Sequence, residues 1–292
     1  MHLIFKKIFI LFWLFQSALF ALGTNFLIFP ENAKDLALGQ HPSLNGSESV
    51  NPSLIKQKSS SPMFYINSGN WFGDISISGL NYVQKIGNYN NRLFLKQGEV
   101  NDLEFRSDKP SDDPIAQFSA YAFQLGSGLA RQSAFGDIGI KVSYLSFGIY
   151  DQVANGLTFD IGFSKLLKNG IGVGFSVLNL GYISKLYEEK PKLPAMALAG
   201  ISKELSFLSA KSRVFSTIEY SVLNSLHKIK TGADILLGPL RMLGGYSITK
   251  HTSEFSIGGG FNYGRFGFIY AMKFGSQNIG EPNIISISYR MP

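Results

Sequence analysis

The chain has 292 residues, no cysteine and a net charge of +7, and only 16% of its residues are charged. The absence of cysteine excludes a disulfide scaffold and a lipid anchor attached through a modified cysteine. The basic residues are dispersed and form no Lys/Arg run of the kind that binds nucleic acid, so we expect no nucleic-acid partner.

Residues 1–23, MHLIFKKIFILFWLFQSALFALG, are typical of a secretory signal peptide. Two lysines precede an apolar run from Ile8 to Phe15, and Ala21 and Gly23 are the small residues that cleavage requires. Cleavage follows Gly23 or, alternatively, Ala21. A membrane anchor is the competing interpretation, but the apolar run is shorter than the roughly 20 residues of a spanning helix. We therefore predict export.

Residues 24–61 lack the alternation of a strand. The stretch PENAKDLALGQ predicts a short helix that begins near Pro30 and ends at Gly39, and an irregular polar stretch follows it. This segment therefore either lies on the periplasmic side of a membrane protein or folds into it as a plug, or hatch.

From residue 62 onward the sequence alternates with a period of two, as in SEFSIGGGFNYGRFGFIYAMKFG at 253–275. Phe255, Ile257 and Phe261 fall on one face of a strand, while Ser256 and Gly258 fall on the other. A tight turn near residues 264–265 would join this strand to the next. Large apolar residues outside and small ones inside are the reverse of a soluble sheet, although a β-sandwich with a glycine-rich surface is the alternative.

About 14 such runs of about 9 to 12 residues fit between residues 62 and 291, the length of a tilted transmembrane strand. Turn signals separate them, at residues 87–88, 155–156, 168–170, 238–239 and 280–283. We expect surface loops at Glu99 to Pro114 and Tyr187 to Pro194. The 25 Phe and 13 Tyr suit a lipid-facing wall with aromatic girdles. The predicted fold is all-β: a transmembrane antiparallel β-barrel of about 14 strands over residues 62–292, in contact with outer-membrane lipid.

Several weak motifs together resemble the PorV/PorQ family of bacterial outer-membrane proteins. NFLIFPENAKDLALGQHPSL followed by SVNPSLI is similar to the family's N-terminal signature, with Lys34 and Ser53 in place of its usual Arg and Ala. The segment from Gly156 to Ser202 is similar to a later series of family motifs. The residues that carry these matches are Pro30, Ala33, Ala37, Leu38, Gly39, Asn51, Pro52, Leu54, Asp160, Gly162, Asn169, Gly170, Gly174, Asn179, Gly181, Leu193 and Pro194.

The resemblance implies a barrel similar to FadL, the long-chain fatty-acid channel, with an N-terminal hatch inside. It also implies a non-enzymatic role in type IX protein secretion or in attaching cargo to the cell surface. The implied partners are the type IX translocon or attachment subunits and the secreted cargo proteins. The alternative function is a FadL-like channel for uptake of hydrophobic small molecules, which predicts an apolar tunnel with a kinked strand or a lateral opening.

Four residues are candidate site residues. Proline biases Asn51 of the Asn51-Pro52 pair toward an extended backbone, which would fix a turn of the hatch against the inner wall. Asp160 and Asp234 fall on the small-residue face, so we expect them to point into the lumen, paired with Lys or Arg or forming a selective pore.

No catalytic or metal site is expected. Neither a nucleophile motif such as Gly-x-Ser-x-Gly nor a His or Cys pair at metal-ligand spacing occurs around His41, His227 or His251. We therefore predict no enzyme activity and no cofactor.

Overall fold

The computed structural model describes residues 23–56, 61–106, 113–207, 210–276 and 280–292. The predicted signal peptide, apart from Gly23, lies outside the described residues and stays a prediction.

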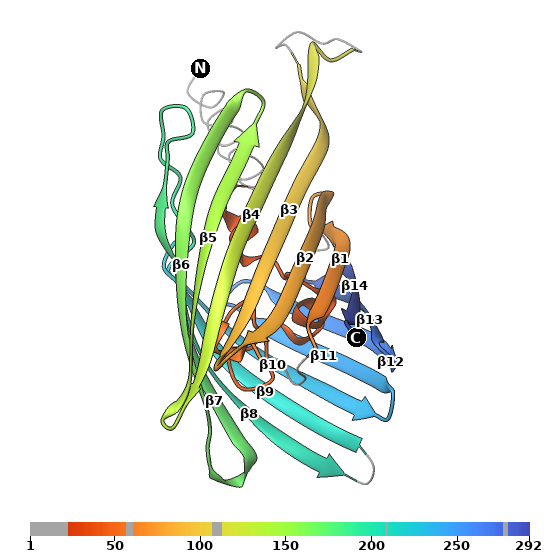
Figure 1. Ribbon diagram of the computed structural model, residues 1–292. Coiled ribbons are helices and arrows are strands. Elements are labelled where there is room, and N and C mark those ends of the chain that lie inside the picture. Colours follow the sequence, from red (N-terminus) through yellow and green to blue (C-terminus); the bar gives the residue numbers. More distant parts are fainter. Residues whose placement is uncertain (1–22, 57–60, 107–112, 208–209, 277–279) are drawn as a thin grey trace.

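Fourteen antiparallel strands close into one barrel, in which each strand pairs with its neighbours in sequence and β1 pairs with β14 (Figure 1). This confirms the predicted fold and rules out a two-sheet sandwich. The strands are β1 Met63–Trp71, β2 Ile75–Ile86, β3 Tyr89–Phe105, β4 Ala116–Ser133, β5 Gly136–Ile149, β6 Gln152–Leu166, β7 Ile171–Ile183, β8 Met196–Phe207, β9 Ala210–Ser221, β10 Leu226–Leu237, β11 Leu240–Ile248, β12 Ser253–Tyr263, β13 Phe266–Gly275 and β14 Asn283–Arg290.

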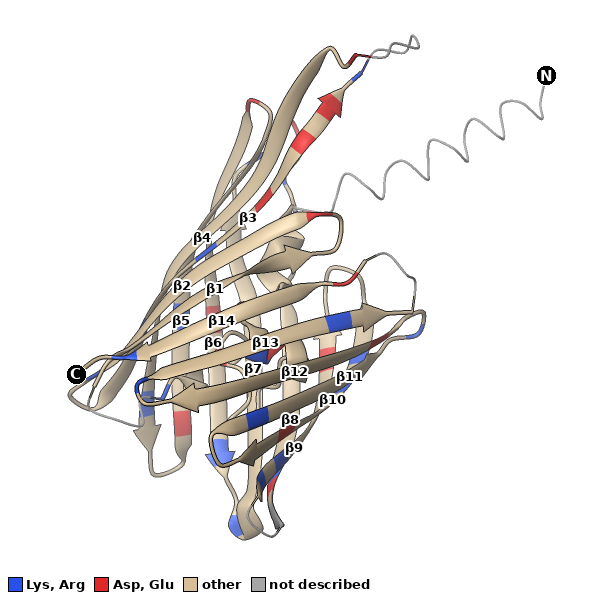
Figure 2. Cartoon of the chain, turned by 90° about the vertical axis from the view of Figure 1, so that its right-hand side faces the viewer, with Lys and Arg blue, Asp and Glu red and all other residues tan. Residues whose placement is uncertain are grey.

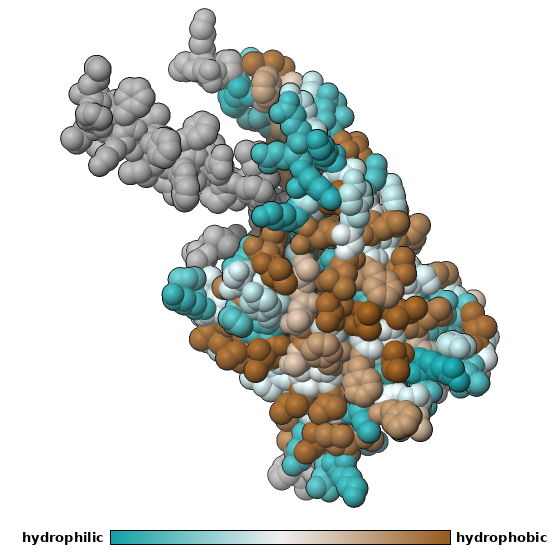
Figure 3. Space-filling view, turned by 90° about the vertical axis from the view of Figure 1, so that its left-hand side faces the viewer, coloured by the Kyte–Doolittle hydropathy of each residue, from teal (hydrophilic) through white to brown (hydrophobic). Residues whose placement is uncertain are grey.

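The alternation places large apolar side chains outside. Phe255, Ile257 and Phe261 of β12 are each 50% exposed, whereas Ser256 and the inward Ala271 of β13 are buried. Brown residues form a band between hydrophilic ends on the face shown in Figure 3. So broad an exposed apolar surface is typical of contact with lipid, because exposing it to water would be energetically costly.

The wall differs in height around the barrel, which corrects one predicted loop. β3 and β4 have 17 and 18 residues, whereas β14 has 8, and β3 to β6 rise above the other strands in Figure 1. The expected loop at Glu99 to Pro114 was therefore wrong over its first half, because β3 continues to Phe105. The polar residues there do not mark a loop. A hairpin that extends beyond the membrane has water on both faces, so its strands also carry polar residues. The turn predicted at residues 155–156 lies inside β6.

The two ends of the barrel differ in their connections. Two-residue turns at 87–88 and 264–265 lie at one end, together with the start of β1 and the end of β14. Long connections, at 106–115, 184–195 and 276–282, lie at the other end. Short turns are periplasmic and long loops extracellular in barrels of this kind.

Residues 23–56, called the hatch below, lie inside the barrel. They contain η1 (Thr24–Ile28), α2 (Ala33–Leu38) and η2 (Pro52–Leu54). Helix α2 packs against β10 to β14, and η2 packs against β4, β5 and β6. The segment is thus a plug and not a periplasmic appendage. Among the described residues, no helix is long and apolar enough to cross a membrane.

Glycine on the inner wall lets the hatch approach. A Cβ atom at Gly258 would lie 2.8 Å from Ala37 Cβ, and one at Gly245 would lie 2.5 Å from the Ala37 carbonyl oxygen. Both contacts are too short for a side chain, so α2 rests directly on the backbone of β11 and β12. Many of the small residues on the inner face therefore serve packing.

The lipid-facing assignment predicts a depth-dependent cost of charge on β12. Ile257→Lys, near the middle of the strand, should destabilise the barrel by about 2–4 kcal/mol, because its ammonium would lie in hydrocarbon. Tyr263→Lys, at the end of the strand, should cost about 0–1 kcal/mol. Urea unfolding from lipid vesicles measures both, and equal costs would contradict the assignment.

Candidate functional site

Asn51 and Pro52 fasten the hatch to β5 and β6. Asn51 caps η2: its Oδ1 accepts hydrogen bonds from the Ser53 backbone N–H at 3.0 Å and the Ser53 hydroxyl at 2.7 Å. Its Nδ2 donates to the Pro42 carbonyl at 2.5 Å and to the Phe163 carbonyl of β6 at 3.0 Å. Every polar atom of this buried amide side chain therefore has a partner.

The wall opposite Asn51-Pro52 is made of two glycines that face each other across β5 and β6. Gly139 pairs with Gly162, and a Cβ at Gly162 would overlap Asn51 Oδ1. A Cβ at Gly139 would overlap the Pro52 backbone. Only glycine fits at either position, so the Asn51-Pro52 turn can approach the wall closely only here.

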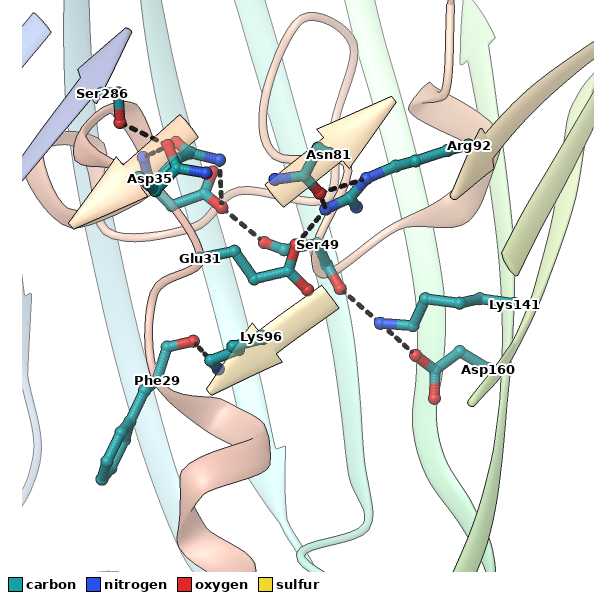
Figure 4. Close-up of polar contacts among 12 residues, drawn as sticks. Phe29, Glu31, Asp35, Ser49, Asn81, Arg92, Lys96, Lys141, Asp160 and Ser286 are labelled. Atoms are coloured by element: carbon teal, nitrogen blue, oxygen red, sulfur yellow. Dashed lines mark hydrogen bonds and ion pairs between the residues drawn. The ribbon is translucent and has the colours of Figure 1, made fainter. Parts of the chain in front are cut away.

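A second contact joins the start of the hatch to β3. The Arg92 guanidinium donates to the Glu31 carboxylate and to Asn81 Oδ1, and both charged groups are buried (Figure 4). Burial opposes ionisation of Glu31, but the charges of Arg92, Lys141 and Lys96 outweigh it and lower the pKa of Glu31 to about 2. Glu31 is thus ionised throughout the physiological pH range.

Two inward lysines hold backbone carbonyls of the hatch. Lys96 Nζ donates to the Phe26 carbonyl at 2.8 Å and the Phe29 carbonyl at 2.7 Å. Lys141 Nζ donates to the Ser49 carbonyl at 3.0 Å and pairs with the Asp160 carboxylate at 2.6 Å. Charged wall side chains thus hydrogen-bond buried backbone carbonyls of the hatch, of which only that of Phe26 also accepts from a hatch N–H, that of Phe29 at 3.3 Å.

Asp160 also stabilises a β-bulge. The ladder between β6 and β7 shifts register there, so that Leu178 and Asn179 of β7 stand opposite Asp160 alone. Asn179 has a φ of 59°, and its N–H, which has lost its partner in the ladder, donates to Asp160 Oδ1 at 2.6 Å. Beyond the bulge the alternation is reversed, so Leu180 and Tyr182 are exposed.

The wall is interrupted next to this bulge. The ladder between β7 and β8 ends at Leu178–Met196, whereas residues 180–183 of β7 pair with β6 only. The connection 184–195 runs between the two strands, and Asn179 Nδ2 holds its end by donating to the Pro194 carbonyl at 3.0 Å. The sheet is therefore discontinuous here toward the extracellular end.

A cavity of about 650 Å³ lies between the hatch and the wall. One side of it is apolar. The rings of Phe29 and Trp71 stack with centroids 4.8 Å apart, and Phe72 lies edge-on to Trp71 at 5.2 Å. The apolar lining residues are Ile28, Phe29, Trp71, Phe72, Ile75 and Met196. Met196 is also the residue at which the β7–β8 ladder ends, so the cavity reaches the interruption in the wall.

The opposite side of the cavity carries paired charges. The Glu254 carboxylate lies 2.8 Å from Lys228 Nζ and 3.3 Å from Lys273 Nζ, and Glu219 lies 2.5 Å from Lys230 Nζ. These groups come from β9, β10, β12 and β13 and neutralise one another in large part. The cavity is therefore amphipathic and not a uniformly polar pore.

His41 anchors the middle of the hatch. It is fully buried, stacks on Phe215 with ring centroids 5.0 Å apart, and bridges Leu38 and Thr217. The Leu38 carbonyl, 2.8 Å from Nε2, can only accept, so Nε2 carries the proton and Nδ1 accepts from the Thr217 hydroxyl at 2.8 Å. Burial, reinforced by the charge of Lys230, lowers the pKa of His41 to about 3.

Asp234 lies away from the other predicted residues. It is buried, and Arg241 of β11 donates to both of its oxygens, at 2.9 and 2.5 Å. Asn51, Pro52 and Asp160 come together around β5 and β6, whereas Asp234 does not join them.

Four residues that hold the hatch were not predicted from the sequence: Glu31, Arg92, Lys96 and Lys141. The last three were recognisable in principle, because each is a lysine or arginine on the strand face that otherwise carries small residues.

Within the described residues, no group of three or more His, Asp or Glu side chains is placed to hold a metal ion.

Two solved structures of similar fold are a hydrocarbon channel and a toluene transporter. The chain resembles the CymD monoaromatic hydrocarbon channel with a TM-score of 0.64 and 11% identity, over 93% of this chain and 99% of that one. It resembles the Pseudomonas putida toluene transporter TodX with a TM-score of 0.60 and 9% identity, over 90% and 97%. No protein-family model and no curated protein sequence matches the chain. The likeness concerns the fold and adds nothing to the PorV/PorQ part of the sequence resemblance. The fold is that of an outer-membrane β-barrel with an N-terminal segment inside.

Removing one partner of the Arg92–Glu31 pair should release the start of the hatch. Arg92→Ala leaves a buried unpaired carboxylate, at a cost of about 3–5 kcal/mol. The double variant Glu31→Gln/Arg92→Met removes both charges and should cost far less. Hydrogen exchange of the hatch amides in detergent measures the difference, and unchanged exchange in Arg92→Ala would disprove this function of the pair.

Docking of the hatch should weaken in mild acid because of His41. The pKa of His41 rises from about 3 when docked to about 6.5 when released, so the released state binds the extra proton. Docking free energy is therefore complete above pH 6.5 and falls by about 2 kcal/mol between pH 6.5 and 5. His41→Gln keeps both hydrogen bonds without titrating. Its hatch exchange should show a smaller pH dependence than that of the wild type, and an equal dependence would exclude His41 as the cause.

Proposed function

We propose that this protein is a non-enzymatic channel of the bacterial outer membrane that takes up small hydrophobic molecules. The observation that carries the proposal is the cavity between the hatch and the wall, with its apolar side of aromatic and aliphatic residues. Its volume lies within the range of small-molecule sites, about 300–1,000 Å³. It is lined by residues of the β1–β2 and β9–β10 turns, at the extracellular end.

The route onward runs through the interruption between β7 and β8. Met196 lines the cavity and begins β8, and Leu180 and Tyr182 just beyond the interruption face outward. A hydrophobic molecule leaving the cavity there enters an apolar environment without crossing the charged side of the lumen. The hatch, fastened by Asn51 and Arg92, would block the straight path through the barrel.

The likeness of the fold to a hydrocarbon channel and a toluene transporter supports this function. The likeness of fold gives no support to the role in type IX secretion that the sequence resemblance implies. Copurification from solubilised outer membranes separates the two functions: bound type IX subunits or cargo would favour secretion, and the barrel alone would favour transport.

A charge at the cavity mouth should slow uptake. Phe72→Arg places a guanidinium beside Trp71 in a turn where water is accessible, so the barrel should still fold. We expect the initial uptake rate of toluene by cells that depend on this protein to fall several-fold, since a charge disfavours apolar contact.

Phe135→Arg is the matched control, because Phe135 is a largely exposed turn residue at the other end of the barrel. Its uptake rate should equal that of the wild type. Equal rates for all three proteins would show that the cavity is not on the transport path.

A further inference from the structure

Three lysines surround the periplasmic end of β7. Lys165 in β6 pairs with Val173, and Lys203 in β8 pairs with Ile171, so the two flank β7 on either side. Lys168 belongs to the turn that joins β6 to β7. In the part of the chain that the structure describes, none of these three ammonium groups has an ion-pair partner.

These lysines lie at the periplasmic edge of the apolar band on the outer surface of the barrel. Along β6 and β8 the outward side chains two residues before each strand lysine are Phe163 and Ile201, and Ile201 is 56% exposed. Two residues of a strand span about 7 Å. Because long lysine stems extend toward water, these ammonium groups can reach the phosphates of lipids from the edge of the apolar band.

Among the described residues around these lysines, the acidic side chain is paired and apolar surface is exposed. The neighbouring Glu204 is on the inward face and pairs with Arg213 at 2.5 Å. Phe175 of β7 and Ile201 of β8, which lie on the membrane side of the lysines, are both exposed. Cations at the edge of the band and apolar side chains toward its middle match a ligand with an anionic head and acyl chains.

Charge is distributed unequally between the two ends of the barrel. Acidic residues gather on the upper part of β3, whereas basic residues mark the lower ends of the strands near β8 and β9 (Figure 2). In β3 the acidic residues are Glu99, Asp102 and Glu104. The periplasmic end is therefore the one that attracts anions.

We propose that Lys165, Lys168 and Lys203 form a binding site for the phosphate of an anionic phospholipid in the periplasmic leaflet. A phospholipid fits better than an anionic protein, because the lysines continue the lipid-facing columns of β6 and β8. Each lysine near an anionic surface contributes about 1 kcal/mol, and salt weakens this attraction. The proposal is independent of what the barrel transports.

Native mass spectrometry of the purified barrel tests the site. The probes are phosphatidylglycerol and phosphatidylcholine with identical acyl chains, and the readout is the ratio of their dissociation constants. The wild type should bind phosphatidylglycerol at least tenfold more tightly. In Lys165→Ala/Lys168→Ala/Lys203→Ala the preference should disappear, and in the corresponding triple Arg variant it should persist.

The control is Lys185→Ala/Lys190→Ala/Lys192→Ala, which removes the same charge from the extracellular connection and should keep the preference. Equal loss in both triple Ala variants would mean that only net charge matters and would overturn the site. So would an unchanged preference in the Lys165/Lys168/Lys203 variant. Lysine-dependent copurification of an anionic periplasmic protein, without any preference for phosphatidylglycerol, would replace the lipid by a protein partner.

Discussion

The close approach of two backbones determines the interior of this barrel. At Gly139 and Gly162, and again at Gly245 and Gly258, the wall lacks the side chains that would hold the hatch away. Since backbone carbonyls of the hatch are thereby buried, wall side chains such as Lys96 and Lys141 must hydrogen-bond them. These four glycines and two lysines thus serve one purpose, which is to make the hatch an integral part of the folded barrel.

The same contact divides the lumen. Where α2 and η2 rest on glycine, no space remains. Where the wall carries long side chains, on β9, β10, β12 and β13, the hatch is kept at a distance and the amphipathic cavity results. The bulge at Asn179, held by Asp160, ends regular pairing beside that cavity. Asp160 therefore connects hatch anchoring, through Lys141, with the shape of the wall.

Local patterns were sufficient to predict the barrel, because alternation in stretches such as Phe255–Phe261 depends only on neighbouring residues. They failed at Glu99, where a strand leaves the membrane and loses its apolar face. The Glu31–Arg92 pair joins residues 61 positions apart, and no local pattern encodes such a pairing. Asn51-Pro52 was identifiable only through its motif, because the two glycines that it contacts, Gly139 and Gly162, lie about 90 to 110 residues later in the sequence.

The placement of the hatch has a consequence for assembly. Helix α2 precedes every strand in the sequence but rests on β10 to β14, the last strands to be made, whereas η2 rests on β4 to β6. Closing so long a chain segment is entropically costly and slow. We therefore expect the hatch to dock in two stages, η2 early and α2 only after the barrel has nearly closed, so that the part of the hatch around α2 is the last to become ordered.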